Sequence, residues 1–166
     1  MAAIYVACPA NFSTGVPELL HQLVSSLNRK GVEAYVYYYN AKKGECPVHN
    51  SFLGYEAPWV TCISDDSSNL LIVPETTTDL LSKFHDIKKS IWWLSVDNYF
   101  AALESRKKYK EWTKLILRHL RIIPAEFQLG KSYPLSFHLC QSFYAKDFLS
   151  RKIANDVPVL QLGDYL

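Results

Sequence analysis

The chain has 166 residues and a mass of 19.0 kDa, the size of one domain, and its 49% hydrophobic content fits a globular protein. A formal net charge of +2 is too small for a typical nucleic-acid-binding protein, so no nucleic-acid partner is expected. No apolar run is long enough to span a bilayer, and the first residues lack the pattern of a secretory signal. We therefore expect a single cytoplasmic domain over residues 1–166.

The first part of the chain alternates between strand and helix patterns. Residues 3–8 are a short apolar run, and residues 17–29 carry leucine and valine at helical spacing. Gly31 ends this helix, and residues 32–39 are rich in the β-branched and aromatic side chains of strands. A helical crossover between two strands predicts that they are parallel.

The middle of the chain continues the alternation after an irregular stretch. Residues 40–58 have no periodicity and predict a long excursion before a short strand near residues 59–63. Residues 69–74 predict a buried strand, residues 75–87 a short helix, and residues 90–96 a further strand.

The longest helical pattern covers residues 101–123, where aromatic and aliphatic side chains recur at intervals of three and four until Pro124. The opposite side of this helix is a basic row. Two interpretations of the row stay open, a solvated face and a peripheral contact with a membrane surface or another anionic partner. The row consists of Lys107, Lys110, Lys114, Arg118 and Arg121.

The last part of the chain predicts two strands, residues 135–140 and 158–162, around a helix over residues 143–153. Six or seven strands that alternate with helices predict an α/β fold, a three-layer αβα sandwich with a mostly parallel, Rossmann-like sheet. Ligands of such sheets bind at the carboxyl ends of the strands. The residues that follow each strand are therefore the candidates for a site.

The loop after the first strand leads into a helix start that contains Gly15, Pro17 and Glu18. Gly15 permits close backbone approach, and the amides of a helix N-terminus can hold a phosphate or a carboxylate. In the alternative interpretation, Gly15 and Pro17 only shape a turn, and Glu18 stabilises the helix start. The glycine patterns of dinucleotide-binding loops and P-loops are absent from the sequence.

Polar side chains also follow two later strands. Glu75 comes directly after the strand that ends at Pro74. Asp97, Asn98 and Tyr99 bring together a carboxylate, an amide and a phenol, a set that suits the hydroxyl groups of a sugar. Capping of the following helix by Asp97 and Asn98 is the alternative.

Two further pairs of neighbouring residues stand at or near strand ends. Gln141 and Ser142 precede the helix over residues 143–153, and Ser142 is predicted to cap it because no histidine with an acidic partner could activate it as a nucleophile. Trp92 and Trp93 are adjacent on a strand, so we expect them to point to opposite faces and to pack under helices.

The cysteines and histidines predict no metal site. Cys8, Cys46, Cys62 and Cys140 lack the paired spacing of zinc sites, and the five histidines form no HExxH or similar pair. We expect the cysteines to be buried free thiols in a reducing compartment.

Four segments in this order resemble the N-terminal half of glycosyltransferases of the GT-B fold, and the resemblance spans nearly the whole chain. They are TGVPELLHQL, NLLIVPE, IWWLSVDNY and the late stretch from CQSFYAKDFL to VLQLGDYL. The resemblance implies two Rossmann-like domains that face each other across a cleft. The N-terminal domain receives the saccharide or other hydroxyl acceptor, and the C-terminal domain binds the nucleotide-sugar donor.

The resemblance also implies roles for individual residues. Gly15 and Glu18 match a loop that in the family approaches the donor phosphates and the acceptor, although Val16 and Pro17 interrupt its usual glycine-rich run. Asp97 is expected to be an acceptor-side catalytic carboxylate. The substrate-binding residues expected beside it are Gly15, Glu18, Glu75, Asn98, Tyr99, Gln141 and Ser142.

The expected function is that of the acceptor-side domain of a glycosyltransferase in polysaccharide biosynthesis, inactive without a C-terminal donor-binding domain or subunit. The resemblance implies no cofactor in this domain, because the nucleotide sugar is the donor substrate of the complete enzyme. Two alternatives stay open: a noncatalytic binding or partner module with a Rossmann-like fold, and a flavodoxin-like nucleotide-binding domain.

Overall fold

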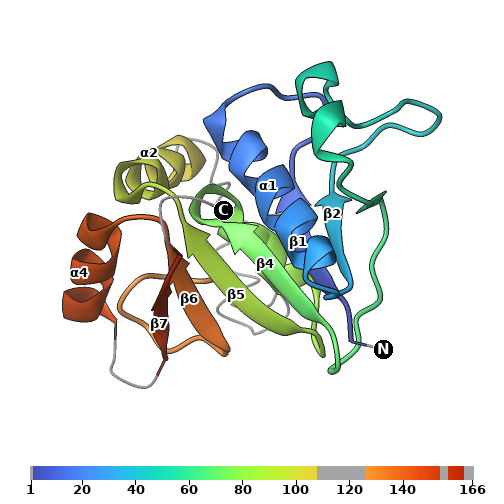
Figure 1. The fold of residues 1–166 in the computed structure, drawn as a ribbon. Helices are drawn as coiled ribbons and strands as arrows, with labels where there is room; N and C mark the ends of the chain where they lie inside the picture. Colours follow the sequence, from blue (N-terminus) through green and yellow to red (C-terminus); the bar gives the residue numbers. More distant parts are fainter. Residues whose placement is uncertain (1, 108–125, 154–156, 163–166) are drawn as a thin grey trace.

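The computed structural model describes residues 2–107, 126–153 and 157–162. Its strands form one seven-stranded sheet in the order β3-β2-β1-β4-β5-β6-β7, and every neighbouring pair is parallel (Figure 1). Helices lie on both faces, so the predicted Rossmann-like three-layer α/β sandwich is confirmed. The strands are β1 (Ile4–Cys8), β2 (Ala34–Tyr38), β3 (Trp59–Val60), β4 (Leu70–Pro74), β5 (Lys88–Trp93), β6 (Phe137–Cys140) and β7 (Val159–Gln161).

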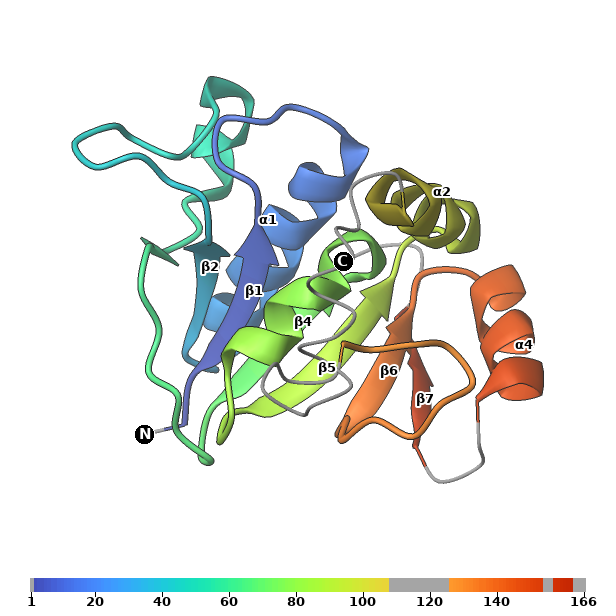
Figure 2. The ribbon, with the colours of Figure 1, turned by 180° about the vertical axis from the view of Figure 1, so that it is seen from behind.

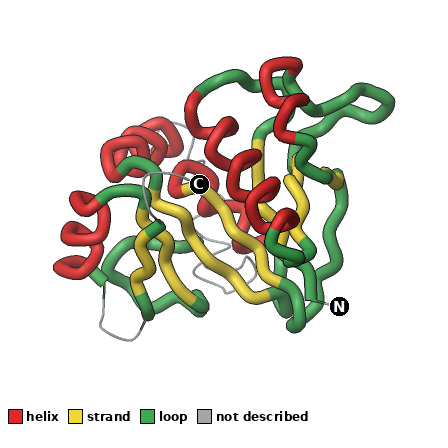
Figure 3. Tube along the Cα trace, viewed as in Figure 1, coloured by secondary structure: helices red, strands yellow, loops and turns green. Residues whose placement is uncertain are grey.

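Helices lie between the strands along the chain (Figure 3), and they are of two kinds. The α-helices in the described part of the chain follow β1, β5 and β6, and shorter 3₁₀ segments precede β3 and follow β4. Their bounds are α1 (Gly15–Arg29), α2 (Val96–Lys107), α4 (Phe143–Lys152), η1 (Asn50–Tyr55) and η2 (Glu75–Lys83).

The sheet grows in two directions from its middle. From β1 the chain moves outward to β2 and β3, whereas β4 to β7 extend the sheet on the other side of β1. Crossovers between parallel strands are right-handed, so opposite directions place the connecting helices on opposite faces. Accordingly, α1 packs on one face and η2, α2 and α4 pack on the other (Figures 1 and 2).

The apolar stripe of α1 shows how the sequence builds one of the two cores. Leu20 and Val24 are one helical turn apart, Leu23 lies beside them, and all three are buried against Val6 of β1 and Val36 of β2. Burial of each side chain contributes about 2 kcal/mol on transfer grounds. The predicted helix therefore faces the sheet as its periodicity requires.

The last two residues of β5 lie in different cores. Trp92 and Trp93 are both completely buried, Trp92 in the core under α1 and Trp93 in the core under η2, α2 and α4. This confirms the prediction that the two rings point to opposite faces. The indole N–H of Trp93 donates a hydrogen bond to Nδ1 of His138 on β6 at 3.0 Å.

The strand predicted over residues 90–96 is wrong at its end. β5 ends at Trp93, and α2 begins at Val96 rather than at residue 101. The hydroxyl of Ser95 accepts a hydrogen bond from the N–H of Asn98 at 3.3 Å, and Asp97 lies in the first turn. A serine cap and an early carboxylate start a helix, and they end the strand although apolar residues continue to Val96.

Two other predicted elements differ in kind or extent. Over residues 75–87 the structure has the 3₁₀ segment η2, in which Thr77 is not helical, with φ −124° and ψ 31°. Three consecutive β-branched threonines disfavour a regular α-helix here. The helix predicted over residues 101–123 is described only as far as Lys107. The rest of its basic row, Lys110, Lys114, Arg118 and Arg121, lies outside the described residues.

The prediction that the cysteines are buried holds for two of them. Burial raises the pKa of Cys8 to about 12 and that of Cys140 to about 11, which keeps both thiols protonated and unreactive. Cys46 and Cys62 are exposed, because the excursion after β2 and the segment after β3 run along the surface. All four are free thiols.

The burial of His138 predicts how stability depends on pH. Burial lowers the pKa of His138 to about 4, whereas an unfolded histidine titrates near 6.5. Between these two pKa values the histidine is protonated in the unfolded chain but neutral in the folded chain. The free energy of unfolding therefore falls as pH falls, by about 3 kcal/mol over the whole window. Urea titrations from pH 7.5 to 4.5 measure this loss.

His138→Asn supplies the control, because an asparagine oxygen can accept the Trp93 N–H but does not titrate. We expect this variant to be less stable at pH 7.5 and to show a shallower dependence on pH. Equal pH dependence in the two proteins would assign the effect to other groups.

Candidate functional site

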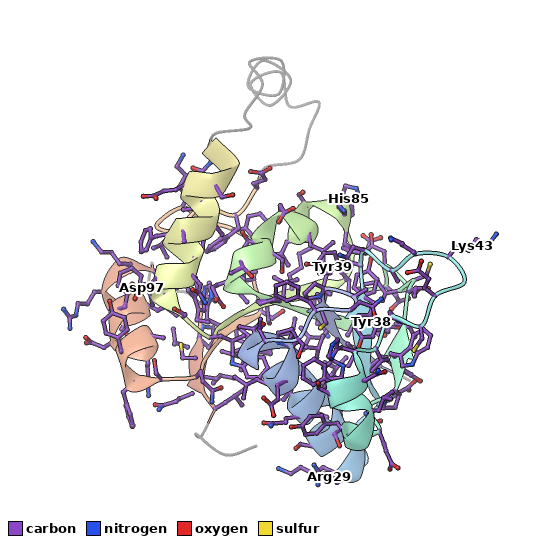
Figure 4. All side chains as sticks on the ribbon, turned by 90° about the horizontal axis from the view of Figure 1, so that it is seen from above. Arg29, Tyr38, Tyr39, Lys43, His85 and Asp97 are labelled. Carbon is purple, nitrogen blue, oxygen red and sulfur yellow. The ribbon has the colours of Figure 1, made fainter. Side chains whose placement is uncertain are left out.

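Because the strands are parallel, their carboxyl ends lie at one edge of the sheet, which Figure 4 views from above. The chain leaves β1 and β4 in opposite directions, so the connections after these two neighbouring strands diverge. Such a switch point is the usual ligand-binding position in open parallel sheets. Here it lies between the loop over residues 9–14 and Glu75.

Gly15 is the exposed first residue of α1, beside this switch point. A Cβ added to it would meet no atom within 4 Å, so the structure does not require glycine there. Asn11 holds the left-handed conformation of the loop, with φ 55°. Thr14, the N-cap, makes no side-chain hydrogen bond to the first turn of α1. A ligand could approach these amides, but no phosphate-cradling loop surrounds them.

Glu18 points toward the excursion after β2 rather than toward the other candidates. Its Oε1 accepts a hydrogen bond from the hydroxyl of Tyr55 at 2.8 Å, and the same hydroxyl accepts one from Gln22 at 3.0 Å. Glu18 therefore fastens η1 to α1. The sequence could not show this bond, because its partners lie 37 residues apart.

His21 also contacts η1 and, in addition, β2. Its Nδ1 lies 2.6 Å from the carbonyl of Pro17, and its Nε2 lies 2.6 Å from the hydroxyl of Tyr38. A carbonyl only accepts, so Nδ1 donates to Pro17 and Nε2 accepts from Tyr38. The ring stacks on Phe52 with centroids 4.7 Å apart. Burial lowers the pKa of His21, and the Pro17 bond opposes that shift. This histidine is therefore structural.

Glu75 is completely buried, with 0% of its surface exposed. Its Oε2 accepts the N–H of Leu94 at 2.9 Å, and the N–H groups of Ser95 and of Glu75 itself also bond to the carboxyl group. Burial raises the pKa of Glu75, and these hydrogen bonds oppose the rise. Its Oε1 is buried without a hydrogen-bond partner among the described residues. The carboxyl group of Glu75 thus lies beside the connection that precedes α2, away from solvent.

Asp97 and Asn98 are exposed in the first turn of α2. Ser95, rather than either of them, caps the helix through its hydroxyl. The side chains of Asp97 and Asn98 therefore do not cap α2. Both lie where a ligand at the sheet edge could reach them, and Figure 4 shows Asp97 beside α4.

Tyr99 is buried, unlike its two neighbours. Its ring packs on Trp93 with centroids 5.0 Å apart, and its hydroxyl accepts the N–H of Leu129 at 3.2 Å. It also forms part of the wall of a mostly apolar cavity of about 690 Å³ between α2, α4 and residues 126–130. Tyr99 joins α2 to the core in this arrangement.

Gln141 and Ser142 connect β6 to its neighbours. The N–H of Gln141 donates to the carbonyl of Trp93 at 3.0 Å, and its side-chain oxygen is buried with no partner in the described part of the chain. The hydroxyl of Ser142 accepts the N–H of Ala145 at 3.1 Å. Ser142 is therefore the N-cap of α4, as predicted.

Sequence reasoning did not select Phe143 and Tyr144, the first two residues of α4. They are 75% and 63% exposed, more than any other large apolar side chain in the described ranges. A signal was present, because the buried residues Ala145 and Leu149 lie one turn apart and define a stripe that excludes both rings.

The helices α2 and α4 touch each other. Phe100 follows Asp97 by one turn, Phe148 follows Tyr144 by one turn, and the rings of Phe100 and Phe148 meet edge to face with centroids 6.0 Å apart. The two helices also start from neighbouring strands. We call the surface formed by Asp97, Asn98, Phe143 and Tyr144 the α2–α4 edge.

The predicted residues therefore fall into two groups. Gly15 and Glu18 belong to α1, which packs on one face of the sheet, whereas the α2–α4 edge belongs to helices on the other face. Glu75 and Gln141 lie near the start of α2, with their side-chain oxygens buried. The exposed part of the second group is the best-formed candidate site.

Comparison with known protein families, curated proteins and solved structures gives no match to this chain. The resemblance to GT-B glycosyltransferases therefore stays a prediction from its motifs. Among the described residues, no group of three or more His, Cys, Asp or Glu side chains is arranged to hold a metal. None of the helices in the same ranges has the length and apolar character needed to cross a membrane.

The link between Glu18 and Tyr55 gives a test of how the excursion is held. Tyr55→Phe removes the hydroxyl shared by Glu18 and Gln22, and we expect the free energy of unfolding to fall by about 1 kcal/mol. Tyr144→Phe is the matched control, because that hydroxyl is on an exposed residue at the helix start. Denaturant titration compares the two, and equal losses would contradict the link.

Proposed function

We propose that this chain is the acceptor-side domain of a glycosyltransferase and that a saccharide acceptor binds at the α2–α4 edge. One observation carries the proposal: exposed aromatic rings at the start of α4 and an exposed carboxylate and amide at the start of α2 belong to helices that touch each other. Exposed apolar side chains that cluster beside polar groups mark interaction sites more often than isolated ones do.

The chemistry of this surface suits a sugar. A sugar ring has apolar C–H faces, which can pack on the rings of Phe143 and Tyr144, and hydroxyl groups at its rim. The Asp97 carboxylate accepts hydrogen bonds, and the Asn98 amide both donates and accepts them. A polar ligand without an apolar face would not use the two rings.

In the complete reaction the acceptor hydroxyl attacks the donor sugar, and the nucleotide leaves with the electrons of the broken bond. Asp97 would take the proton of the attacking hydroxyl as a general base. A separate C-terminal domain or subunit would bind the nucleotide sugar, and the first turn of α1 with Gly15 would face the donor phosphates. The isolated chain would then bind an acceptor without transferring a sugar.

The exposed rings also favour a second candidate function, a noncatalytic module that docks on a partner protein. Aromatic side chains are enriched at such interfaces. This alternative needs no saccharide contact by Asp97 and Asn98.

Titration of the chain with a panel of oligosaccharides, followed by NMR, tests the proposal. Tyr144→Ala should weaken binding roughly tenfold, because it removes a stacking partner, and Asp97→Asn should weaken it by several-fold. Trp59→Ala on the edge strand β3 and Glu104→Gln further along α2 are matched controls and should leave Kd unchanged.

Two results would count against the saccharide site. One is the absence of any shift at α2 and α4 with every oligosaccharide at millimolar concentration. The other is an equal loss of affinity in the site variants and the controls. A protein partner that is lost with Tyr144→Ala but retained with Asp97→Asn would favour the docking module.

A further inference from the structure

Glu75 is the one carboxylate among the buried side chains of the described residues. An ionised carboxylate costs several kcal/mol to bury unless charges or hydrogen bonds compensate. No ion pair of Glu75 occurs in the described part of the chain, so its compensation comes from backbone amides. A leucine would fill a similar volume without this cost. The groups that bond to the carboxylate therefore indicate why a glutamate stands here.

The carboxylate holds the chain between β5 and α2. Leu94 and Ser95 form this connection, and both donate their N–H groups to Glu75, with the Leu94 bond at 2.9 Å. Hydrogen bonds to a charged acceptor are roughly twice as strong as neutral ones. The first residue of η2 therefore fixes two successive amides of a neighbouring connection.

Ser95 transmits this anchor to the helix. Its backbone is bound to Glu75, and its hydroxyl accepts the N–H of Asn98 at 3.3 Å. The negative charge also lies near the N-terminus of α2, where the helix dipole favours it. Asp97 lies in the chain between these two attached residues, Ser95 and Asn98.

The same connection is fastened from its other neighbour. Gln141, at the end of β6, donates its N–H to the carbonyl of Trp93, the residue before Leu94. The end of β5 is therefore held by a side chain from the start of η2 and by a backbone bond from the residue that follows β6. The bond from Gln141 is made by its backbone, so only the bond from Glu75 depends on the identity of a side chain.

We propose that Glu75 is a positioning residue: its carboxylate fixes the chain before α2 and thereby the place of Asp97 at the α2–α4 edge. Glu75 contacts no ligand in this role. A shift of the connection would move Asp97 and Asn98 together relative to the rings on α4. The role of the edge in saccharide binding rests on the proposed function, whereas the anchor itself does not.

Amide hydrogen exchange measured residue by residue by NMR tests the anchor without any saccharide. Glu75→Leu removes both acceptor oxygens, and we expect Leu94 and Ser95 to exchange at least tenfold faster relative to core amides of β1 and β2. Glu75→Gln keeps the shape and one acceptor oxygen, so the same two amides should accelerate by a smaller factor, about threefold. Selective loosening at these positions is not expected from a general loss of stability.

Leu20→Ala on α1 is the matched control, because it destabilises the other core and leaves Glu75 in place. It should accelerate exchange broadly, without selectivity for Leu94 and Ser95. Uniform acceleration in the Glu75 variants, or unchanged exchange at both amides, would overturn the proposal. If Glu75→Leu does not fold, the Glu75→Gln comparison decides alone.

Saccharide titration of Glu75→Gln then connects the anchor to the site. We expect a loss of affinity similar to that of Asp97→Asn, several-fold, although Glu75 is buried away from the ligand. Unchanged affinity in a protein with selectively loosened amides would overturn the positioning role. A native chain that binds no saccharide but shows the selective exchange would contradict the proposed function and leave the anchor standing.

Discussion

The right-handed crossover between parallel strands is the constraint on which this structure depends. The chain moves outward from β1 in one direction and from β4 in the other, so its helices must cover both faces of the sheet. Each strand then needs apolar side chains on both sides. Trp92 and Trp93 meet this need at the end of β5, one in each core, and a slip of one residue in β5 would exchange their faces.

Several buried hydrogen bonds gather around the end of β5. Trp93 donates its indole N–H to His138, its carbonyl accepts from Gln141, and the next amide donates to Glu75. Each bond satisfies a group that would be costly to bury alone. Together they hold the point from which α2 departs, so the position of the exposed edge depends on buried hydrogen bonds on both sides of β5.

The strands and the first helix could be predicted because their signals are local. The apolar run of β1 and the stripe of Leu20, Leu23 and Val24 have the periods that their burial requires. The start of α2 could not be predicted, because apolar residues continue from β5 to Val96 and extend the strand pattern past the serine cap. The candidate site was located only in part: Asp97 and Asn98 are exposed at a helix start, whereas Phe143 and Tyr144 were overlooked.

The sequence by itself determined the fold class, the alternation of strands and helices, and the edge at which polar side chains collect, since these follow from periodicity and chain direction. Only the tertiary structure decided what each polar residue does. Glu18 bonds to a tyrosine 37 positions away, and Glu75 turns into the core toward Leu94. Both glutamates lie in the helical segment that follows a strand, and burial and partners distant along the chain give them different surroundings. No local pattern encodes those partners, because packing brings them together only when the sheet has formed.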